Sequence, residues 1–185
     1  MFSPTAQTWQ RQAEEGALSG IGNAALLGAP LVGFFASRQC PGNAIRAAMD
    51  WAVTQARASL TVVSGFHSPL EQSVLKVYLA AKAPAVLVLA RPVQRARLPA
   101  EWQAAVIAGH LVVLSATPDG ATVALRLTEA GARARNEVVA RLAVRIVIAH
   151  AAPGGRLAGQ AADWHAAGRP LQWLCVTPRC DTPEW

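Results

Sequence analysis

The 185-residue chain is 52% hydrophobic and 15% charged, which excludes an intrinsically disordered protein and suits one domain with a sizeable core. Its formal net charge is +6, and arginine carries nearly all of the positive charge because Lys76 and Lys82 are the only lysines. An arginine excess favours contacts with phosphate or carboxylate groups, although a genome that favours arginine codons would produce the same composition.

The sequence contains no evident targeting or membrane segment. The first residues lack a basic stretch followed by an apolar run, which a signal peptide requires. The longest apolar stretch, residues 24–37, is too short to span a bilayer and contains Pro30. Three cysteines (Cys40, Cys175 and Cys180) do not make an even disulfide set, and the histidines show no metal-binding spacing. We therefore expect a cytoplasmic protein with no membrane association and no metal site.

The order of predicted elements alternates between strands and helices. Residues 1–28 are expected to form a helical or looped cap on the domain, and residues 177–185 an irregular tail. Continuous apolar runs predict strands over 31–36, 60–63, 85–89, 111–114, 144–148 and 171–176. Apolar residues at helical spacing and helix boundary signals predict helices over about 45–56, 69–82, 99–109, 122–142 and 158–167.

This alternation predicts an α/β domain over residues 29–176. Repeated strand–helix–strand units are typical of a Rossmann-like, doubly wound and mainly parallel sheet with helices on both faces. Right-handed crossovers place the carboxyl ends of the parallel strands at one edge of the sheet. Ligands bind outside this edge, where the strand order reverses.

The segments that follow the strands carry hydroxyl groups, glycines and arginines. Small residues let a backbone approach a ligand, and hydroxyl and N–H groups at helix starts bind anions. Turns require Gly, Ser and Pro in any case, but their convergence with several arginines favours an anion site. The candidate phosphate-binding residues are Ser37, Arg38, Ser64, Gly65, His67, Ser68, Arg91, Ser115, Gly154 and Gly155.

A capping box provides the clearest local signal. Ser68 can act as the N-cap of a helix, Pro69 takes its first position, and Glu71 can complete the box. We interpret Glu71 as a structural residue for this reason.

The sequence has no Gly-x-x-x-x-Gly-Lys-Ser/Thr phosphate loop, so no cofactor is predicted beyond a bound nucleotide or phosphate.

Four segments stand in a familiar order: Val32-Gly33-Phe-Phe-Ala-Ser37-Arg38, Ser64-Gly65-Phe66-His67-Ser68, the apolar run from Gly109 to Ser115, and Arg135-Asn136-Glu137. Together, over roughly residues 30–157, they resemble the motifs of the DprA/Smf DNA-processing family. The resemblance implies a Rossmann-like domain of the superfamily that also includes the "Lonely guy" phosphoribohydrolases. Members of the DprA family bind single-stranded DNA and load recombinase onto it. By analogy, Arg135 and Asn136 would line the pocket with Ser37, Arg38, Ser64 and Gly65.

The sequence departs from this family in two motifs. Ala116 stands where the family has Glu, and Pro153-Gly154-Gly155-Arg156-Leu157 replaces its Ser-Gly-Ser-Leu. The Pro-Gly-Gly is similar to the phosphoribohydrolase motif, but the Gly-Thr and the downstream Glu are absent. Three functions therefore stay open: a non-catalytic module that binds nucleotide or nucleic-acid phosphate, a nucleoside-monophosphate phosphoribohydrolase, and a structural protein with a vestigial pocket.

The expected partners follow from charge and from exposed aromatic residues. A small phosphorylated ligand is expected to bind more tightly than single-stranded DNA, whose binding should be weak and salt-dependent. A track for DNA would join Arg91, Arg95 and Arg97 to Arg38 and Arg135, and Phe66 is the only aromatic side chain expected to stack there. Tryptophans in predicted helices and tails, with the resemblance, predict a homo-oligomer through exposed apolar surface; these are Trp9, Trp51, Trp102 and Trp185.

Overall fold

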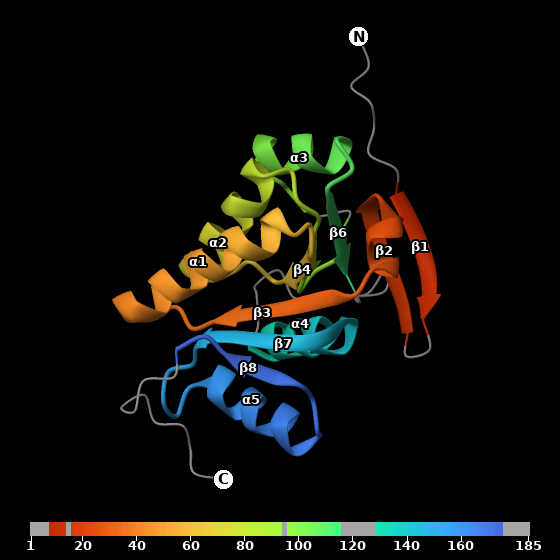
Figure 1. The fold of residues 1–185 in the computed structure, drawn as a ribbon. Helices are drawn as coiled ribbons and strands as arrows, with labels where there is room; N and C mark the ends of the chain where they lie inside the picture. Colours follow the sequence, from red (N-terminus) through yellow and green to blue (C-terminus); the bar gives the residue numbers. More distant parts are fainter. Residues whose placement is uncertain (1–7, 14–15, 94–95, 116–128, 176–185) are drawn as a thin grey trace.

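A computed structural model describes residues 8–13, 16–93, 96–115 and 129–175. In these residues one sheet of eight strands is flanked by α-helices (Figure 1). The elements, in chain order, are β1 (Thr8–Ala13), β2 (Gly16–Gly22), the 3-10 helix η1 (Ala24–Gly28), β3 (Leu31–Ala36), α1 (Gly42–Arg57), β4 (Thr61–Ser64), α2 (Pro69–Ala80), β5 (Ala85–Leu89), α3 (Ala100–Ile107), β6 (Leu111–Ser115), α4 (Glu129–Leu142), β7 (Ala143–His150), α5 (Arg156–Ala166) and β8 (Leu171–Trp173).

The sheet has the strand order β1-β2-β6-β5-β4-β3-β7-β8. All pairs from β6 to β8 are parallel, and β2 pairs antiparallel with both β1 and β6. The chain runs outward from β3 to β6 and then returns to the other side of β3 as β7. The predicted doubly wound, mainly parallel α/β fold is thus confirmed, and its strand order reverses between β3 and β7.

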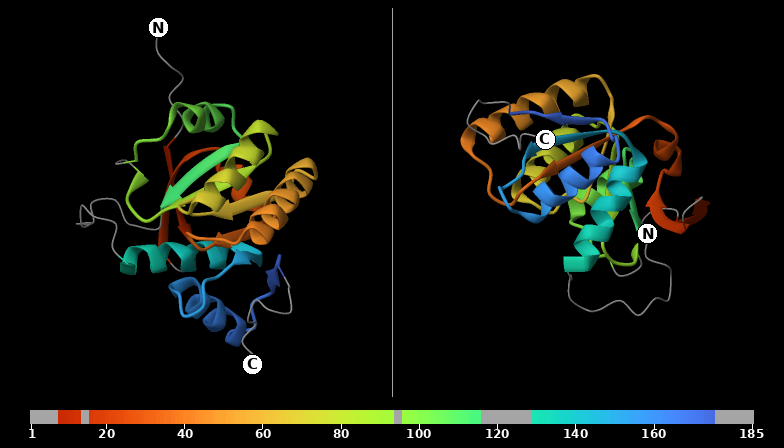
Figure 2. Two further views of the ribbon diagram at one scale, coloured as in Figure 1. Left: turned by 90° about the vertical axis from the view of Figure 1, so that its left-hand side faces the viewer. Right: turned by 90° about the horizontal axis from the view of Figure 1, so that it is seen from below.

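Helices cover both faces of the sheet (Figure 2). Helices α1, α2 and α3 pack on one face, and α4 and α5 pack on the other. In β3, Phe34 stacks on Trp51 of α1 with ring centroids 5.0 Å apart, and Phe35 contacts Trp164 of α5 at 4.8 Å. Because β3 is covered on both faces, its sequence is a continuous apolar run rather than an alternating one.

The amino-terminal segment corrects one expectation. Residues 8–22 were expected to be helical or looped, but β1 and β2 form a hairpin that extends the sheet beyond β6. A Cβ atom on Gly20 would lie 2.7 Å from Cε2 of Trp9, so the indole ring covers that glycine. Trp9 also donates from Nε1 to the carbonyl of Gly22 at 3.1 Å. This cross-strand packing fixes the hairpin, although its strands carry no continuous apolar run.

The other predicted elements agree with the structure to within a few residues. Strand β8 ends at Trp173, before the predicted end at residue 176, and its last hydrogen bond to β7 runs from the N–H of Leu174 to the carbonyl of Ile148 at 3.0 Å. Helix α4 is described from Glu129, so its predicted start at residue 122 and the tail from residue 177 lie outside the described residues. No helix in the described ranges is both long and apolar enough to cross a membrane.

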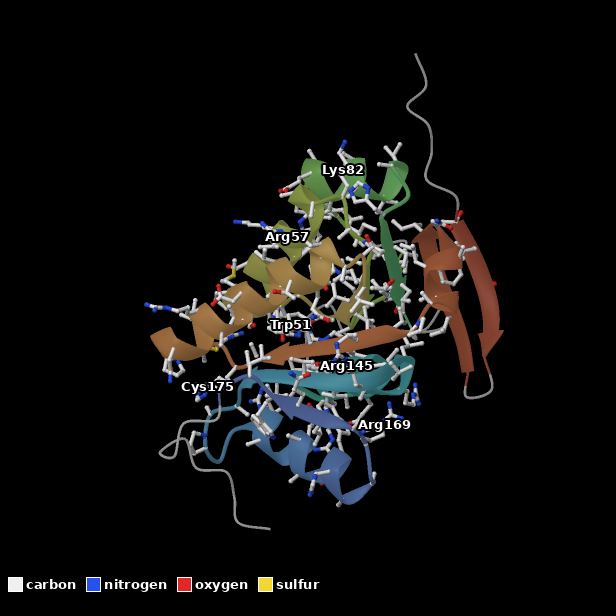
Figure 3. All side chains as sticks on the ribbon, in the orientation of Figure 1. Trp51, Arg57, Lys82, Arg145, Arg169 and Cys175 are labelled. Carbon is white, nitrogen blue, oxygen red and sulfur yellow. The ribbon has the colours of Figure 1, made fainter. Side chains whose placement is uncertain are left out.

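The tryptophans do not provide the apolar surface expected of them. Trp51 is 8% exposed and lies between α1 and the sheet, where Figure 3 labels it. Trp102 packs against the same core cluster, and Trp9 covers Gly20. Trp185 lies outside the described residues. The homo-oligomer therefore stays a prediction that these tryptophans do not support.

Candidate functional site

Ser37 joins the two loops at the point where the strand order reverses. Its backbone N–H donates to the carbonyl of His150 at the end of β7, at 2.9 Å. Its hydroxyl oxygen accepts from the N–H of Ala152, also at 2.9 Å. Ser37 thus uses both groups to hold the β3 and β7 loops together. Arg38 follows directly and is exposed at this edge.

The loop after β4 has an unusual backbone. Phe66 has a φ of +43°, in the left-handed region that residues other than glycine seldom occupy. Its N–H donates to the hydroxyl oxygen of the fully buried Ser64 at 3.2 Å, and its ring is 2% exposed within the core. The expectation that Phe66 stacks on a base is therefore wrong. Burial of the ring instead fixes the conformation of this loop.

Glu71 of α2 fastens this loop to β3 from inside. Its Oε2 accepts from the N–H groups of His67 (2.8 Å) and Ser68 (3.1 Å), and Oε1 accepts from Ala36 at the end of β3 (3.1 Å). The predicted capping box is confirmed, since Ser68 Oγ accepts from the Glu71 N–H. Burial raises the pKa of the Glu71 carboxyl, against the opposing effect of the three N–H donors and of Arg135.

This internal carboxylate limits what the start of α2 can bind. The N–H groups of His67 and Ser68 would otherwise be offered to an anion, as at many helix starts. Here both donate to Glu71, and Ser68 is only 5% exposed. Ser68 therefore supports the loop rather than a ligand. At the start of α2, side chains must therefore supply the positive charge in place of these two N–H groups.

Arg135 reaches the same edge from the opposite face of the sheet. It belongs to α4, yet a Cβ atom on Gly65 would lie 2.7 Å from its Cζ atom. The guanidinium group thus lies on the backbone of the β4 loop, in the space that a side chain at position 65 would fill. Burial lowers the pKa of Arg135, and the charge of Glu71 opposes that shift.

His67 connects these positive groups electrostatically. Its side chain is exposed. Its pKa is lowered first by desolvation and then by the charges of Arg135 and Arg38. Both guanidinium groups therefore act on one imidazole, although one follows β3 and the other belongs to α4. We call Arg38, His67 and Arg135 the basic cluster; its charge suits a phosphate group.

The remaining candidate residues divide by exposure. Ser64 and Ser115 are fully buried, so their hydroxyl groups face the interior of the domain. Gly154 (φ +66°) and Gly155 form the turn before α5, and a Cβ on Gly155 would lie 2.8 Å from the carbonyl oxygen of Ala152. Arg91 and Arg97 are exposed after β5, and Arg95 lies outside the described residues. Asn136 accepts from Arg135 Nη2 at 2.9 Å.

Sequence reasoning missed two parts of this site. The bond from Ala36 to Glu71 joins segments 35 residues apart, and nothing in the local capping motif indicates it. The hydrogen bonds of Asn136, Glu137, Gln160 and Trp164 depend on the packing of α4 against α5. The available signal for these hydrogen bonds was the amide of Asn136 beside the carboxylate of Glu137 in the helix predicted over residues 122–142.

Comparison with known proteins agrees with this architecture. A family model described as DNA recombination-mediator protein A matches residues 7–167. DNA processing protein A from Helicobacter pylori, solved in a study of its single-stranded DNA binding mode, has a TM-score of 0.75 at 16% identity, covering 95% of this chain and 83% of that one. A search of curated proteins gave no match.

Two further solved structures share the fold. DNA processing protein A from Streptococcus pneumoniae has a TM-score of 0.69 at 20% identity over 85% of this chain. This chain covers 54% of that protein, about half of its length. The molybdenum cofactor carrier protein of Chlamydomonas reinhardtii has a TM-score of 0.52 at 15% identity, covering 78% of this chain and 76% of that one. Since the family model spans most of the sequence, the chain belongs to the DNA recombination-mediator protein A family.

Proposed function

We propose that this chain binds phosphate groups of single-stranded DNA at the carboxyl edge of its sheet and performs no chemistry on them. The observation that carries the proposal is the basic cluster, in which desolvation and then the charges of Arg135 and Arg38 lower the pKa of His67. Positive groups that lie close together repel one another, and an anion bound among them relieves this repulsion. Membership of the family, and the single-stranded DNA bound by the Helicobacter pylori protein, favour DNA as the source of that anion.

The neighbouring groups support binding rather than catalysis. The two oxygens of Glu71 already accept three backbone N–H groups, so this carboxylate is not placed to attack a ribosyl carbon. The hydroxyl of Ser64 is fully buried and accepts from the N–H of Phe66. A phosphoribohydrolase would need a free carboxylate here, and the described residues of this edge offer no observation that favours that alternative.

The test is the affinity of a labelled single-stranded oligonucleotide, measured by fluorescence anisotropy for Arg38→Ala and Arg57→Ala. Arg57 is exposed at the far end of α1, near the amino ends of the strands, and its loss changes the net charge equally (Figure 3). A charge-assisted phosphate contact contributes about 1.5–3 kcal/mol, so Arg38→Ala should bind about tenfold more weakly or worse. Equal affinity for Arg38→Ala and the unmodified protein would refute the proposal.

Salt and ligand size complete the measurement. Affinity should fall steeply between about 50 and 200 mM salt, because each phosphate contact releases counterions. A mononucleotide competitor shows whether a single phosphate group is sufficient. If a mononucleotide displaces the labelled oligonucleotide at a lower concentration than the unlabelled oligonucleotide does, a small phosphorylated ligand is the preferred one. In that case Arg38→Ala must weaken the binding of both the mononucleotide and the oligonucleotide.

A further inference from the structure

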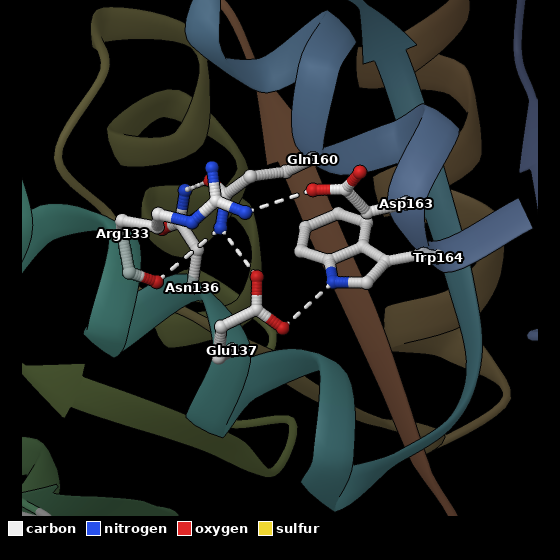
Figure 4. A network of polar contacts seen from close by, with 6 residues as sticks. All are labelled: Arg133, Asn136, Glu137, Gln160, Asp163 and Trp164. Carbon is white, nitrogen blue, oxygen red and sulfur yellow. Dashed lines mark hydrogen bonds and ion pairs between the residues drawn. The ribbon is translucent and has the colours of Figure 1, made fainter. Parts of the chain in front are cut away.

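Helices α4 and α5 are joined by a continuous series of hydrogen bonds, which Figure 4 shows from Trp164 to Asn136 and which ends at Arg135. Trp164 Nε1 donates to Glu137 Oε2 at 3.0 Å, and Gln160 Nε2 donates to Glu137 Oε1 at 2.7 Å. Asn136 Nδ2 donates to Gln160 Oε1 at 2.8 Å. Arg135 then donates from Nε (3.2 Å) and Nη2 (2.9 Å) to Asn136 Oδ1.

The direction of each bond in this series is determined by Glu137. A side-chain amide can turn over and exchange its donor for its acceptor, so its orientation depends on its partners. An ionised carboxylate only accepts, and Gln160 Nε2 also donates to the carbonyl of Arg133 at 3.3 Å. Gln160 must therefore present Oε1 to Asn136. Asn136 in turn presents Oδ1 to Arg135, because its Nδ2 is used.

Burial makes this order strict. Gln160 is 2% exposed and Trp164 is 4% exposed, so water cannot readily replace a missing partner. At the other end, Asn136 Oδ1 occupies Nε and one hydrogen of Nη2 on Arg135. The two hydrogens of Nη1 and the second hydrogen of Nη2 have no hydrogen-bond partner among the residues that the structure describes. The guanidinium group is held on one side and can bind an anion with the other.

We propose that Glu137, Gln160 and Asn136 are positioning residues, which orient Arg135 toward the phosphate group bound at the carboxyl edge. This inference rests on the proposed function, because it assigns the bound phosphate to Arg135. It adds that the half-buried carboxylate of Glu137 governs binding from a distance, through two amides. Glu137 itself does not touch the ligand. We call the series Trp164–Glu137–Gln160–Asn136–Arg135 the relay.

Glu137→Gln is the sharpest variant, because it keeps the size of the side chain. An amide at position 137 can accept from only one of Trp164 and Gln160 without placing its NH2 group against the other donor. The conflict is relieved when the side-chain amides of Gln160 and Asn136 rotate by half a turn. Asn136 then presents its NH2 group, a donor, to the donors of Arg135 and no longer holds the guanidinium group. Asp163→Asn is the matched control: it removes the same charge from the same helix pair, in an ion pair with Arg133 whose side chains are each 61% exposed.

The experiment measures oligonucleotide affinity and its salt dependence for Glu137→Gln, Asp163→Asn, Arg135→Ala and the double variant Arg135→Ala/Glu137→Gln. Thermal unfolding is recorded for each variant. We expect Glu137→Gln to weaken binding about tenfold, the lower end of the loss caused when a hydrogen-bond partner that orients a metal ligand is removed. It should also reduce the slope of log affinity against log salt by about 0.7, the value of one contact with single-stranded nucleic acid. Asp163→Asn should bind like the unmodified protein.

The double variant separates positioning from general stability. If the relay acts through Arg135, Glu137→Gln has no further effect once Arg135 is absent. If Glu137→Gln lowers the affinity equally in the unmodified protein and in Arg135→Ala, the inference is overturned. It is also overturned if Arg135→Ala binds more weakly while Glu137→Gln binds like the unmodified protein. Asn136→Ala, at a half-buried position, gives the same comparison if Glu137→Gln does not fold. Failure of the proposed function gives a different result: either the unmodified protein does not bind the oligonucleotide, or Arg38→Ala binds it as tightly as the unmodified protein does.

Discussion

A Cβ atom on Gly65 would lie 2.7 Å from Cζ of Arg135, so the guanidinium group of α4 rests on the backbone of the β4 loop. These two residues come from opposite sides of the sheet and lie 70 positions apart in the sequence. The contact is what brings the positive charge of α4 to the carboxyl edge. Position 65 therefore controls Arg135 without carrying a side chain.

We expect Gly65→Ala to weaken oligonucleotide binding about as much as Arg135→Ala does. The added methyl group would displace a side chain and not the backbone, so the fold should tolerate it. Thermal unfolding should change by only a few degrees, while anisotropy shows the loss of affinity. Gly28→Ala is the control, because a Cβ on Gly28 meets no atom within 4 Å. Full affinity in Gly65→Ala would show that Arg135 binds from another position.

Binding should strengthen as the pH falls, and His67 should be the cause. Burial and the two guanidinium groups lower the pKa of His67 in the free protein. A bound phosphate favours the protonated imidazole and raises that pKa, so binding takes up a proton. Affinity therefore rises as pH falls through the pKa of the complex toward that of the free protein, by at most about tenfold per pH unit.

Affinity measured at constant ionic strength between about pH 8 and 5.5 tests this linkage. His67→Gln should remove most of the pH dependence. His110→Gln is the control, because desolvation and then Lys82 lower the pKa of His110 as well, but it precedes β6 at the other edge. An unchanged pH profile in His67→Gln would place the phosphate away from the imidazole.

Glu71→Gln should destabilise the protein by about 1–3 kcal/mol. An amide cannot accept from the three N–H groups of Ala36, His67 and Ser68, so at least one buried donor loses its partner. Denaturant unfolding gives the difference in free energy. Glu129→Gln breaks an exposed ion pair with Arg156 and should cost less than about 1 kcal/mol. Equal stability of the two variants would contradict the role given to Glu71.

No release of free base from nucleoside monophosphates is expected. Glu71 is engaged by backbone donors, and the Gly-Thr and Glu expected after Pro153-Gly154-Gly155 in a phosphoribohydrolase are absent from the sequence. A sensitive free-base assay with purified protein measures this directly. Turnover that Glu71→Gln abolishes would establish an enzyme and would replace the binding function proposed above. Asp119, a second carboxylate, follows β6 in the sequence and lies outside the described residues.

The layered core could be predicted from the sequence because its signals are local. A strand such as Leu31–Ala36, covered on both faces, reads as an unbroken apolar run, and Ser68 with Glu71 marks the start of α2 without any tertiary knowledge. The order of such elements is sufficient to predict the edge at which Arg38 and His67 stand. The handedness of strand crossovers supplies the rest.

Other features depend on contacts between distant segments. The polar sequence Thr8–Ala13 becomes a strand because it pairs with β2, which in turn pairs with the edge of β6. Phe66 looked like a surface aromatic, but its left-handed backbone turns the ring into the core. The orientation of Arg135 requires the packing of α4 on α5, which no periodicity within either helix describes.

The amino-terminal hairpin also determines which strand forms one edge of the sheet. Strand β6 is wholly buried and is apolar from Leu111 to Leu114, and an open edge of this kind is a template for pairing with other chains. The hairpin covers β6 and moves the edge of the sheet outward to the sequence Thr-Trp-Gln-Arg-Gln-Ala of β1. A charged and polar outer strand resists such pairing. Removal of residues 1–23 would leave the carboxyl edge of the sheet intact and yet yield a protein that aggregates through Leu111–Ser115.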